Sequence, residues 1–205
     1  MSMASRERVA LEPRRRPGRL RVAALLEAGA AVIAERGFEA ATMAEIAARA
    51  GAPIGSLYRF FPNKEVLAGA LLRRFKNTID DAFATVDARA GELSIAALTD
   101  ALFALVDELR GEIRPMAALL DAHSDWSVKR SEFRSAVRTH IARTLTACRP
   151  GLDAQSAGDI AAILLQLMKM KSQLTREAAD AKNPRVLNEL RKMTQLYLED
   201  RLGAG

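Results

Sequence analysis

Three helix starts lie close together in the stretch TMAEIAARAGAPIGSLYRFFPNKE, which occupies positions 42–65. Thr42 and Glu45 have the spacing of a capping box, in which each side chain bonds the other residue's backbone N–H. Gly51 ends the first short helix, Pro53 suits the first turn of the second, and Asn63 can cap a third. Helices this short are marginal alone in water, so neighbouring helices must hold them.

Two short helices joined by a tight turn that contains glycine predict a helix-turn-helix. In this motif the first helix braces the second, and the second enters the major groove of DNA with its N-terminal residues toward the base edges. A short second helix fits that groove. Leu57 and Phe61 supply its inward anchors.

Apolar residues recur every three to four positions from Arg19 onward, and no segment shows sustained two-residue alternation. The sequence therefore predicts an all-α fold. The expected parts are a flexible basic arm at 1–18, a small part at 19–62 that contains the helix-turn-helix, and a larger helical part at 63–205. About nine helices are expected, at roughly 19–36, 43–50, 53–61, 64–91, 95–109, 115–123, 127–148 (or 131–148), 154–181 and 184–202.

The charge of the chain favours a polyanionic partner. Its formal net charge is +6, and seven arginines against two glutamates lie in residues 1–21. Cys148 is the only cysteine, which excludes an intramolecular disulfide and a zinc site built from thiolates and fits a reducing cytoplasm. No stretch reaches the roughly 18 apolar residues of a membrane span. Neither a membrane partner nor a cofactor or metal is expected.

Many positions of this region agree at once with one known pattern. In order and spacing they resemble the TetR family of bacterial transcriptional regulators (TetR/AcrR type), over roughly residues 20–70. The residues that carry the resemblance are Ala34–Phe38, Thr42, Ile46–Ala47, Ala50–Gly51, Gly55–Tyr58, Phe61–Glu65 and Leu67.

The resemblance implies a set of DNA contacts. Family members commonly hold the DNA backbone with residues at the positions of Thr42, Tyr58 and Lys64, two of which begin helices, where phosphate is favoured. On the second helix of the motif, Gly55 permits close approach, Ser56 can meet a phosphate or a base edge, and Arg59 can reach guanine. Ile54 can make an apolar contact with a thymine methyl group. Pro53 stands where members of the family often have Ser or Thr.

Each of these residues also has a purely structural interpretation. Thr42 can serve only as a helix cap, Tyr58 as a packing residue, and Arg59 as a solvated surface charge. The basic arm either follows phosphates or the minor groove, or is only a solubilising tail. Phe60 is expected in the core rather than on DNA.

The family dimerises through its last two helices, and a dimer reads two half-sites of a palindromic operator. The interface residues implied here are Ile160, Ile163, Leu167, Leu190, Met193 and Tyr197. Family members also hold a small-molecule effector among helices four to eight. The candidate pocket residues, whose alternative role is plain core, are Phe75, Phe83, Phe103, Met116, Leu120, His123, Trp126, Phe133 and Met168.

The resemblance thus predicts a dimeric repressor that a small, largely apolar effector releases from DNA. Catalysis is not expected, because His140 and Cys148 lie more than two helical turns apart and no phosphate-binding glycine loop occurs. The remaining alternative is a helical interaction module or anti-regulator that uses the same fold without specific DNA binding. Pro53 and Ile54 favour it, since they remove polar groups from the reading helix.

Overall fold

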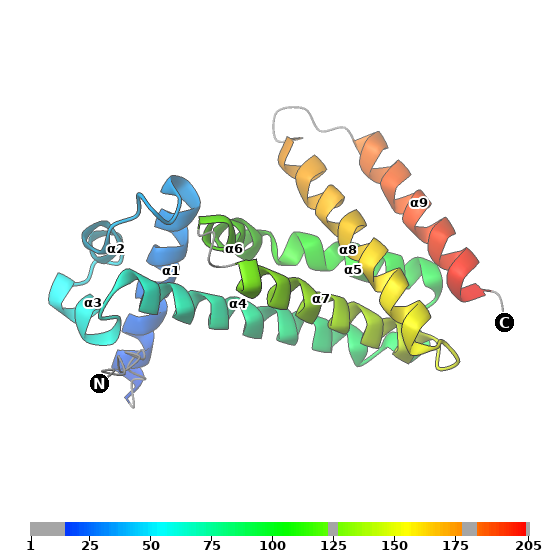
Figure 1. The fold of residues 1–205 in the computed structure, drawn as a ribbon, viewed down its shortest axis with the longest axis horizontal. Helices are drawn as coiled ribbons and strands as arrows, with labels where there is room; N and C mark the ends of the chain where they lie inside the picture. Colours follow the sequence, from blue (N-terminus) through cyan, green and yellow to red (C-terminus); the bar gives the residue numbers. More distant parts are fainter. Residues whose placement is uncertain (1–14, 123–126, 178–183, 204–205) are drawn as a thin grey trace, which may run out of the picture. The chain divides into compact units, whose positions relative to one another are not determined.

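A computed structural model describes residues 15–122, 127–177 and 184–203, and within these ranges all regular structure is helical (Figure 1). The predicted all-α class is confirmed. The helices are α1 Arg16–Arg36, α2 Met43–Arg49, α3 Ile54–Phe60, α4 Lys64–Asp87, the 3-10 helix η1 Ala90–Glu92, α5 Ile95–Glu108, α6 Arg110–Ala122, α7 Ser127–Cys148, α8 Ala154–Glu177 and α9 Pro184–Gly203.

Three helix starts differ from the expected ones; the smallest difference is at α3, which begins at Ile54 with Pro53 as its N-cap. Helix α1 begins at Arg16 rather than Arg19, because Pro17 is compatible with a first helical turn. Helix α6 begins at Arg110, so Pro115 lies inside it instead of opening it. Proline inside a helix removes one backbone hydrogen bond, and its ring crowds the carbonyl four residues before it, at a cost of about 3 kcal/mol. The expected caps Ser94 and Asn63 are confirmed, since each side chain accepts from the backbone N–H three residues on.

The chain packs as two compact units. Of the described residues, unit 1 comprises 15–76, 111–122 and 127–128, and unit 2 comprises 77–110, 129–177 and 184–203. The boundary between the units therefore falls within α4. The functional division expected at residues 62–63 stays a prediction.

Unit 1 holds the two short helices through one apolar core. Leu57 of α3 and Ile46 of α2 are fully buried in that core. Gly29 lets α1 approach α4 closely, because a Cβ at this position would lie 3.2 Å from Leu67 Cδ2. Other buried members are Leu25, Val32, Ile33, Phe38, Phe61, Leu67, Leu71, Phe75 and Leu119.

Two ion pairs fasten α2 to α1. Arg49 donates two hydrogen bonds to the Glu35 carboxylate, at 2.5 and 2.7 Å, and Arg36 Nε donates to Glu45 Oε1 at 2.6 Å. The bond from Arg49 lowers the pKa of Glu35 below its ordinary value. The pairs are solvent-exposed, so their main effect is to fix the position of α2 on α1.

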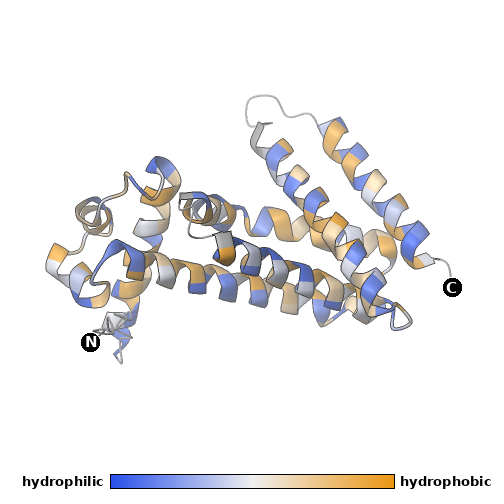
Figure 2. Ribbon diagram, in the orientation of Figure 1, coloured by the Kyte–Doolittle hydropathy of each residue, from blue (hydrophilic) through white to orange (hydrophobic). Residues whose placement is uncertain are grey.

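Unit 2 contains α5, α8 and α9, which contact one another pairwise. Helix α5 is largely hydrophobic (Figure 2) and buries Leu98, Leu102 and Val106. Helix α8 contributes Ile160, Ala161 and Leu164. The apolar contact among these helices is the main stabilising term for unit 2.

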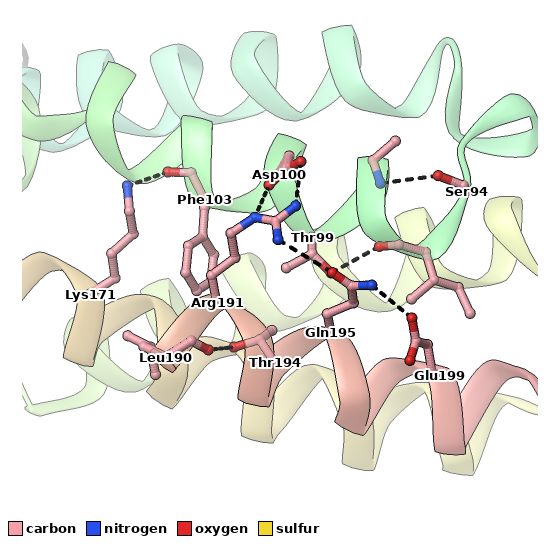
Figure 3. Close-up of polar contacts among 12 residues, drawn as sticks. Ser94, Thr99, Asp100, Phe103, Lys171, Leu190, Arg191, Thr194, Gln195 and Glu199 are labelled. Carbon is pink, nitrogen blue, oxygen red and sulfur yellow. Dashed lines mark hydrogen bonds and ion pairs between the residues drawn. The ribbon is translucent and has the colours of Figure 1, made fainter. Parts of the chain in front are cut away.

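Polar bonds set how α8 and α9 lie on α5 (Figure 3). Arg191 of α9 bonds both carboxylate oxygens of Asp100 on α5, at 2.5 and 2.7 Å. The nearly buried Lys171 of α8 donates to the Phe103 carbonyl and to Asp107 Oδ2, both at 2.6 Å. These bonds are directional, so they select one rotation of each helix about its axis.

A third polar group joins the end of α4 to α7. His140 Nε2 lies 2.8 Å from Asp80 Oδ1, and the imidazole stacks on the Phe83 ring with centroids 5.1 Å apart. The buried Thr144 hydroxyl donates to Asp87, which also pairs with Arg143. Within unit 2 the residues of α4 are thus held by both ring packing and charge.

The Asp100–Arg191 pair should contribute to stability in a pH-dependent way. The bond to Arg191 lowers the pKa of Asp100 from 3.8, so its contribution is complete above that value and is lost as the pH falls through the lowered pKa. We expect Asp100→Asn to lower the free energy of unfolding at pH 7 by up to about 1 kcal/mol, a difference that disappears in acid.

Urea unfolding of the wild type and of D100N between pH 7 and pH 3 measures this effect. Glu189→Gln is the matched control, because the Glu189–Lys192 pair lies wholly on α9 and joins no second helix. If D100N and E189Q lose the same free energy of unfolding, the ion pair between α5 and α9 adds no stability of its own.

Candidate nucleic-acid interface

Helix α2 begins with a side-chain cap. Thr42 has extended backbone angles (φ −111°, ψ 147°), and its hydroxyl oxygen accepts from the Glu45 N–H at 3.2 Å. This half of the predicted capping box is confirmed. The other half was wrong: the Glu45 carboxylate bonds Arg36 of α1 instead of turning back to the Thr42 N–H. Thr42 itself is exposed.

The turn between α2 and α3 depends on Gly51. Its φ is +59°, a left-handed conformation that glycine adopts without strain. The N–H groups of Gly51 and Ala52 bond the carbonyls of Ala48 and Ala47 and so close the end of α2. Pro53 follows as the N-cap of α3 without a side-chain bond.

Helix α3 has one buried face and one exposed face. Leu57 and Phe60 are buried, which confirms Phe60 as a core residue and not an outward one. Ser56 is partly buried. The exposed fractions of Ile54 and Tyr58 are 44% and 49%, large for an isoleucine and a tyrosine on so short a helix. The exposed residues of this face are Pro53, Ile54, Gly55, Tyr58 and Arg59.

Neither backbone conformation nor crowding by the described residues explains why position 55 is a glycine. Its φ is not positive, and a Cβ added to it would meet no atom within 4 Å. A glycine inside a helix nevertheless costs roughly 0.5–1 kcal/mol relative to alanine. The residue therefore fits a partner that must come close to the backbone of α3.

Lys64, expected to hold a phosphate, is already engaged within unit 1. Its Nζ donates to the carbonyls of Phe38 and Glu39 at 2.8 and 2.9 Å, and lies 4.6 Å from the centre of the Phe38 ring. Two of the three ammonium N–H groups are thus used to hold the segment that follows α1. The sequence pattern did not indicate this role.

The candidate pocket residues are divided between the two units. Phe75, Met116 and Leu120 belong to unit 1, where Phe75 is a core residue. Phe83, Phe103, Phe133 and Met168 belong to unit 2, and His123 and Trp126 lie outside the residues that the structure describes. An open depression of about 320 Å³ in unit 2 involves none of these candidates; its lining is Ser135, Arg138, Thr139, Ala142, Gln155, Gly158, Asp159 and Ala162.

The candidate interface residues on α8 and α9 also fall into two groups. Ile160, Leu167 and Leu190 are buried within the chain, so they are corrected to core residues. Ile163 and Met193 are exposed by 47% and 48%, and Tyr197 is partly buried. Three further apolar residues of these helices are exposed: Leu196, and two that the sequence did not indicate, Met170 and Val186. Only a knowledge of which face meets α5 could have distinguished the two groups.

Metal sites and membrane spans are both absent from the described ranges. There, no group of three or more His, Cys, Asp or Glu residues could hold a metal ion. No helix in those ranges is long and apolar enough to cross a membrane.

Comparison with known proteins bears directly on the helix-turn-helix. Residues 25–77 match the family described as bacterial regulatory proteins, tetR family. The chain is 28% identical over 119 residues to the HTH-type transcriptional repressor DhaR of Mycobacterium sp. (strain GP1), covering 58% of this chain and 57% of that protein. It is 51% identical over 51 residues to the HTH-type transcriptional repressor KstR2 of Mycobacterium tuberculosis, covering 25% and 26%. The chain thus spans about half and about a quarter of these relatives.

Solved structures extend the likeness to most of the chain. A TetR-family transcriptional regulator from Streptomyces coelicolor matches with a TM-score of 0.59 at 24% identity, over 89% of this chain and 99% of that one. A transcriptional regulator (TerR/AcrR family) from Aquifex aeolicus VF5 gives 0.65 at 18% identity, over 86% and 99%. At these identities the matches show a shared fold.

The cap at Thr42 gives a prediction about stability. Thr42→Ala removes the acceptor for the Glu45 N–H, so we expect a loss of about 1 kcal/mol in the free energy of unfolding. Thr42→Ser keeps the hydroxyl and should retain most of it. Urea denaturation of the three proteins measures the effect. If T42A is as stable as the wild type, the bond does not cap α2.

Proposed function

We propose that this chain, which belongs to the TetR family of bacterial DNA-binding transcriptional regulators, is a cytoplasmic repressor that binds a palindromic operator as a dimer. A small, largely apolar effector would release it from DNA. The family consists of regulators and not of enzymes. The two relatives named above are both transcriptional repressors, which supports repression here.

The observation that carries the proposal is the exposed face of α3. Its inner residue Leu57 fixes the helix in the core of unit 1, while Ile54, Gly55, Tyr58 and Arg59 face solvent. These four residues are apolar, small, aromatic and cationic. Together they can contact the methyl groups, acceptor atoms and phosphates that a DNA groove exposes. Among the described residues of unit 1, only Arg59 of the four has a side-chain partner: its guanidinium lies 5.7 Å from the centre of the Phe60 ring.

The role of each residue follows from its place. Arg59 would reach a guanine edge or a phosphate, Ile54 a thymine methyl, and Tyr58 and Ser56 a phosphate oxygen. Pro53 offers no N–H and would make only an apolar contact. Thr42 can accept its cap bond while its hydroxyl proton goes to a phosphate.

Lys64 would contribute less than the sequence pattern indicates. Two carbonyls already take two of its N–H groups, which leaves its third N–H for a phosphate. Helix α1 offers a second positive region, because Arg16 and Arg19 are exposed and its first turn holds no acidic residue. Cations at that end are opposed by the helix dipole and would be stabilised by a phosphate.

Exposed apolar side chains on α8 and α9 support the dimer. Ile163 and Met170 lie seven residues apart on α8, and Val186 and Met193 lie seven apart on α9. Such spacing gives each helix one apolar stripe, which pairing with a second copy would bury. A two-fold dimer would place two copies of α3 on two half-sites.

The effector would bind in unit 2 and act on the population of DNA-competent dimers. Phe83, Phe103, Phe133 and Met168 are the aromatic and thioether candidates that unit 2 retains. Met and aromatic side chains adapt to apolar molecules. An effector that favours a different separation of the two α3 helices would release the operator.

Gly55 provides a direct test of the assigned face. Gly55→Ala should raise the free energy of unfolding by roughly 0.5–1 kcal/mol, because helix propensity improves and the added Cβ meets open space. The same change should weaken binding to specific DNA by roughly tenfold or more, because the methyl group would hold α3 away from the duplex.

Urea unfolding and fluorescence anisotropy with labelled duplex measure the two effects. Gly111→Ala is the matched control, since Gly111 is also helical and also has open space around it, but lies on α6. Equal operator affinity of G55A and the wild type would remove this face of α3 from the DNA contact.

Selection of random duplex DNA by the purified protein, read by sequencing, tests the function itself. We expect enrichment of a palindrome whose half-sites are one helical turn or more apart, about 34–36 Å centre to centre. The affinity should fall steeply with added salt as phosphate counterions are released. Failure to retain any duplex, even at low salt, would instead support a helical interaction module with the same fold.

A further inference from the structure

The depression between α7 and α8 in unit 2 takes no part in the function proposed above. Its volume is about 320 Å³. Helix α7 lines it with positions 135, 138, 139 and 142, and helix α8 with positions 155, 158, 159 and 162. Both sets have the spacing i, i+3, i+4 and i+7, so one face of each helix forms one wall of the depression.

Gly158 keeps the middle of the depression hollow. It lies inside α8, its φ is not positive, and a Cβ added to it would meet no atom within 4 Å. Glycine stabilises a helix less than alanine does, so the fold of the described residues gives no reason for it. Ala142 and Ala162 are small as well. An apolar part of a ligand therefore fits against this part of the lining.

Opposite charges line the depression without pairing with each other. Arg138 comes from α7 and Asp159 from α8, each near the middle of its set, and both are exposed. Within the described part of the chain, Arg138 forms no hydrogen bond or ion pair, and Asp159 forms no ion pair. Asp159 Oδ1 accepts from Gln155 Nε2 at 3.1 Å, which leaves Oδ2 available.

Two hydroxyl groups add acceptor atoms to the same space. The Thr139 hydroxyl donates to the Ser135 carbonyl at 3.0 Å, so its oxygen still has a lone pair to offer. The Ser135 side chain also lines the depression. The depression thus supplies guanidinium donors together with carboxylate and hydroxyl acceptors. This combination is complementary to a molecule that carries a negative and a positive group at once.

The size of the depression limits what it can hold. A water molecule occupies about 30 Å³ in the liquid, so the space takes roughly ten non-hydrogen atoms. A free α-amino acid has a carboxylate, an ammonium group and a side chain within that size. The interiors of interfaces between protein chains are depleted of charged residues, so the charged lining favours a small molecule over a helix of another chain.

We propose that the depression between α7 and α8 binds a free α-amino acid with an apolar side chain. The carboxylate of the ligand bonds the Arg138 guanidinium, and its ammonium group bonds Asp159 Oδ2. The apolar side chain lies against Gly158 and its small neighbours. None of the candidate effector residues lines this site. The inference uses neither DNA binding nor the dimer, so a chain that fails to bind an operator would leave it standing.

L-Leucine and two analogues test the chemical class of the ligand. The analogue 4-methylpentanoate lacks the ammonium group, and 3-methylbutylamine lacks the carboxylate. NMR titration of the isotope-labelled full chain without DNA measures binding. We expect saturable shifts of the Gly158 and Thr139 amide signals with leucine, at a dissociation constant of about 1 mM or lower. Each analogue should bind roughly tenfold more weakly or worse, because one charged group of the site stays unpaired.

Gly158→Ala separates the site from the fold. The added methyl group fills part of the depression, so leucine should bind roughly tenfold more weakly. Resistance to urea should not fall, because the helix propensity of α8 improves. Gly111→Ala is the matched control, a helical glycine in open space on α6. Arg138→Gln should also weaken binding, whereas Arg134→Gln, an exposed arginine of α7 outside the lining, should not.

Two results would overturn the inference at different levels. Equal binding of leucine and 4-methylpentanoate would reduce the site to an anion contact at Arg138 and reject the amino-acid class. The site itself would be rejected if leucine caused no saturable shifts at Gly158 and Thr139, or if G158A and R138Q both bound it as the wild type does.

Discussion

The position of the exposed face of α3 depends on the burial of Leu57 in the core of unit 1. Helix α3 spans only Ile54–Phe60, too few residues to be stable alone. Leu57 is fully buried and Phe60 nearly so, and burial of such side chains stabilises by about 1.5–3 kcal/mol each. With that face fixed, Ile54, Gly55, Tyr58 and Arg59 are left exposed. The core therefore decides which side chains a partner can meet.

Local signals in the sequence were enough to find these elements. Thr42, Gly51 and Asn63 each act within three or four residues of their own position, so their caps and turns could be predicted. Contacts between distant segments could not. Glu45 bonds Arg36 of α1 rather than its own helix start, and Lys64 bonds carbonyls 25 and 26 residues away. A long charged side chain has several partners within reach, and only the fold selects one.

The same limit explains the dimer candidates. Ile160 and Ile163 are three residues apart on an amphipathic helix, and sequence periodicity treats them alike. The structure buries the first and exposes the second because Lys171 and Arg191 fix how α8 and α9 lie on α5. A helix that must serve both its own core and a second copy has two apolar faces, and single-residue hydrophobicity cannot assign a residue to one of them.

The placement of charge in unit 1 says more about its partner than the net charge of +6 does. On α2 and the end of α1, arginines are matched by acids: Arg49 by Glu35 and Arg36 by Glu45. These cations are neutralised and serve to join the helices. Among the residues that the structure describes, Arg59 of α3 and Arg16 and Arg19 of α1 form no ion pair. A phosphate backbone attracts cations that are not already paired, so under the proposed function DNA would meet α3 and the first turn of α1 rather than most of α2.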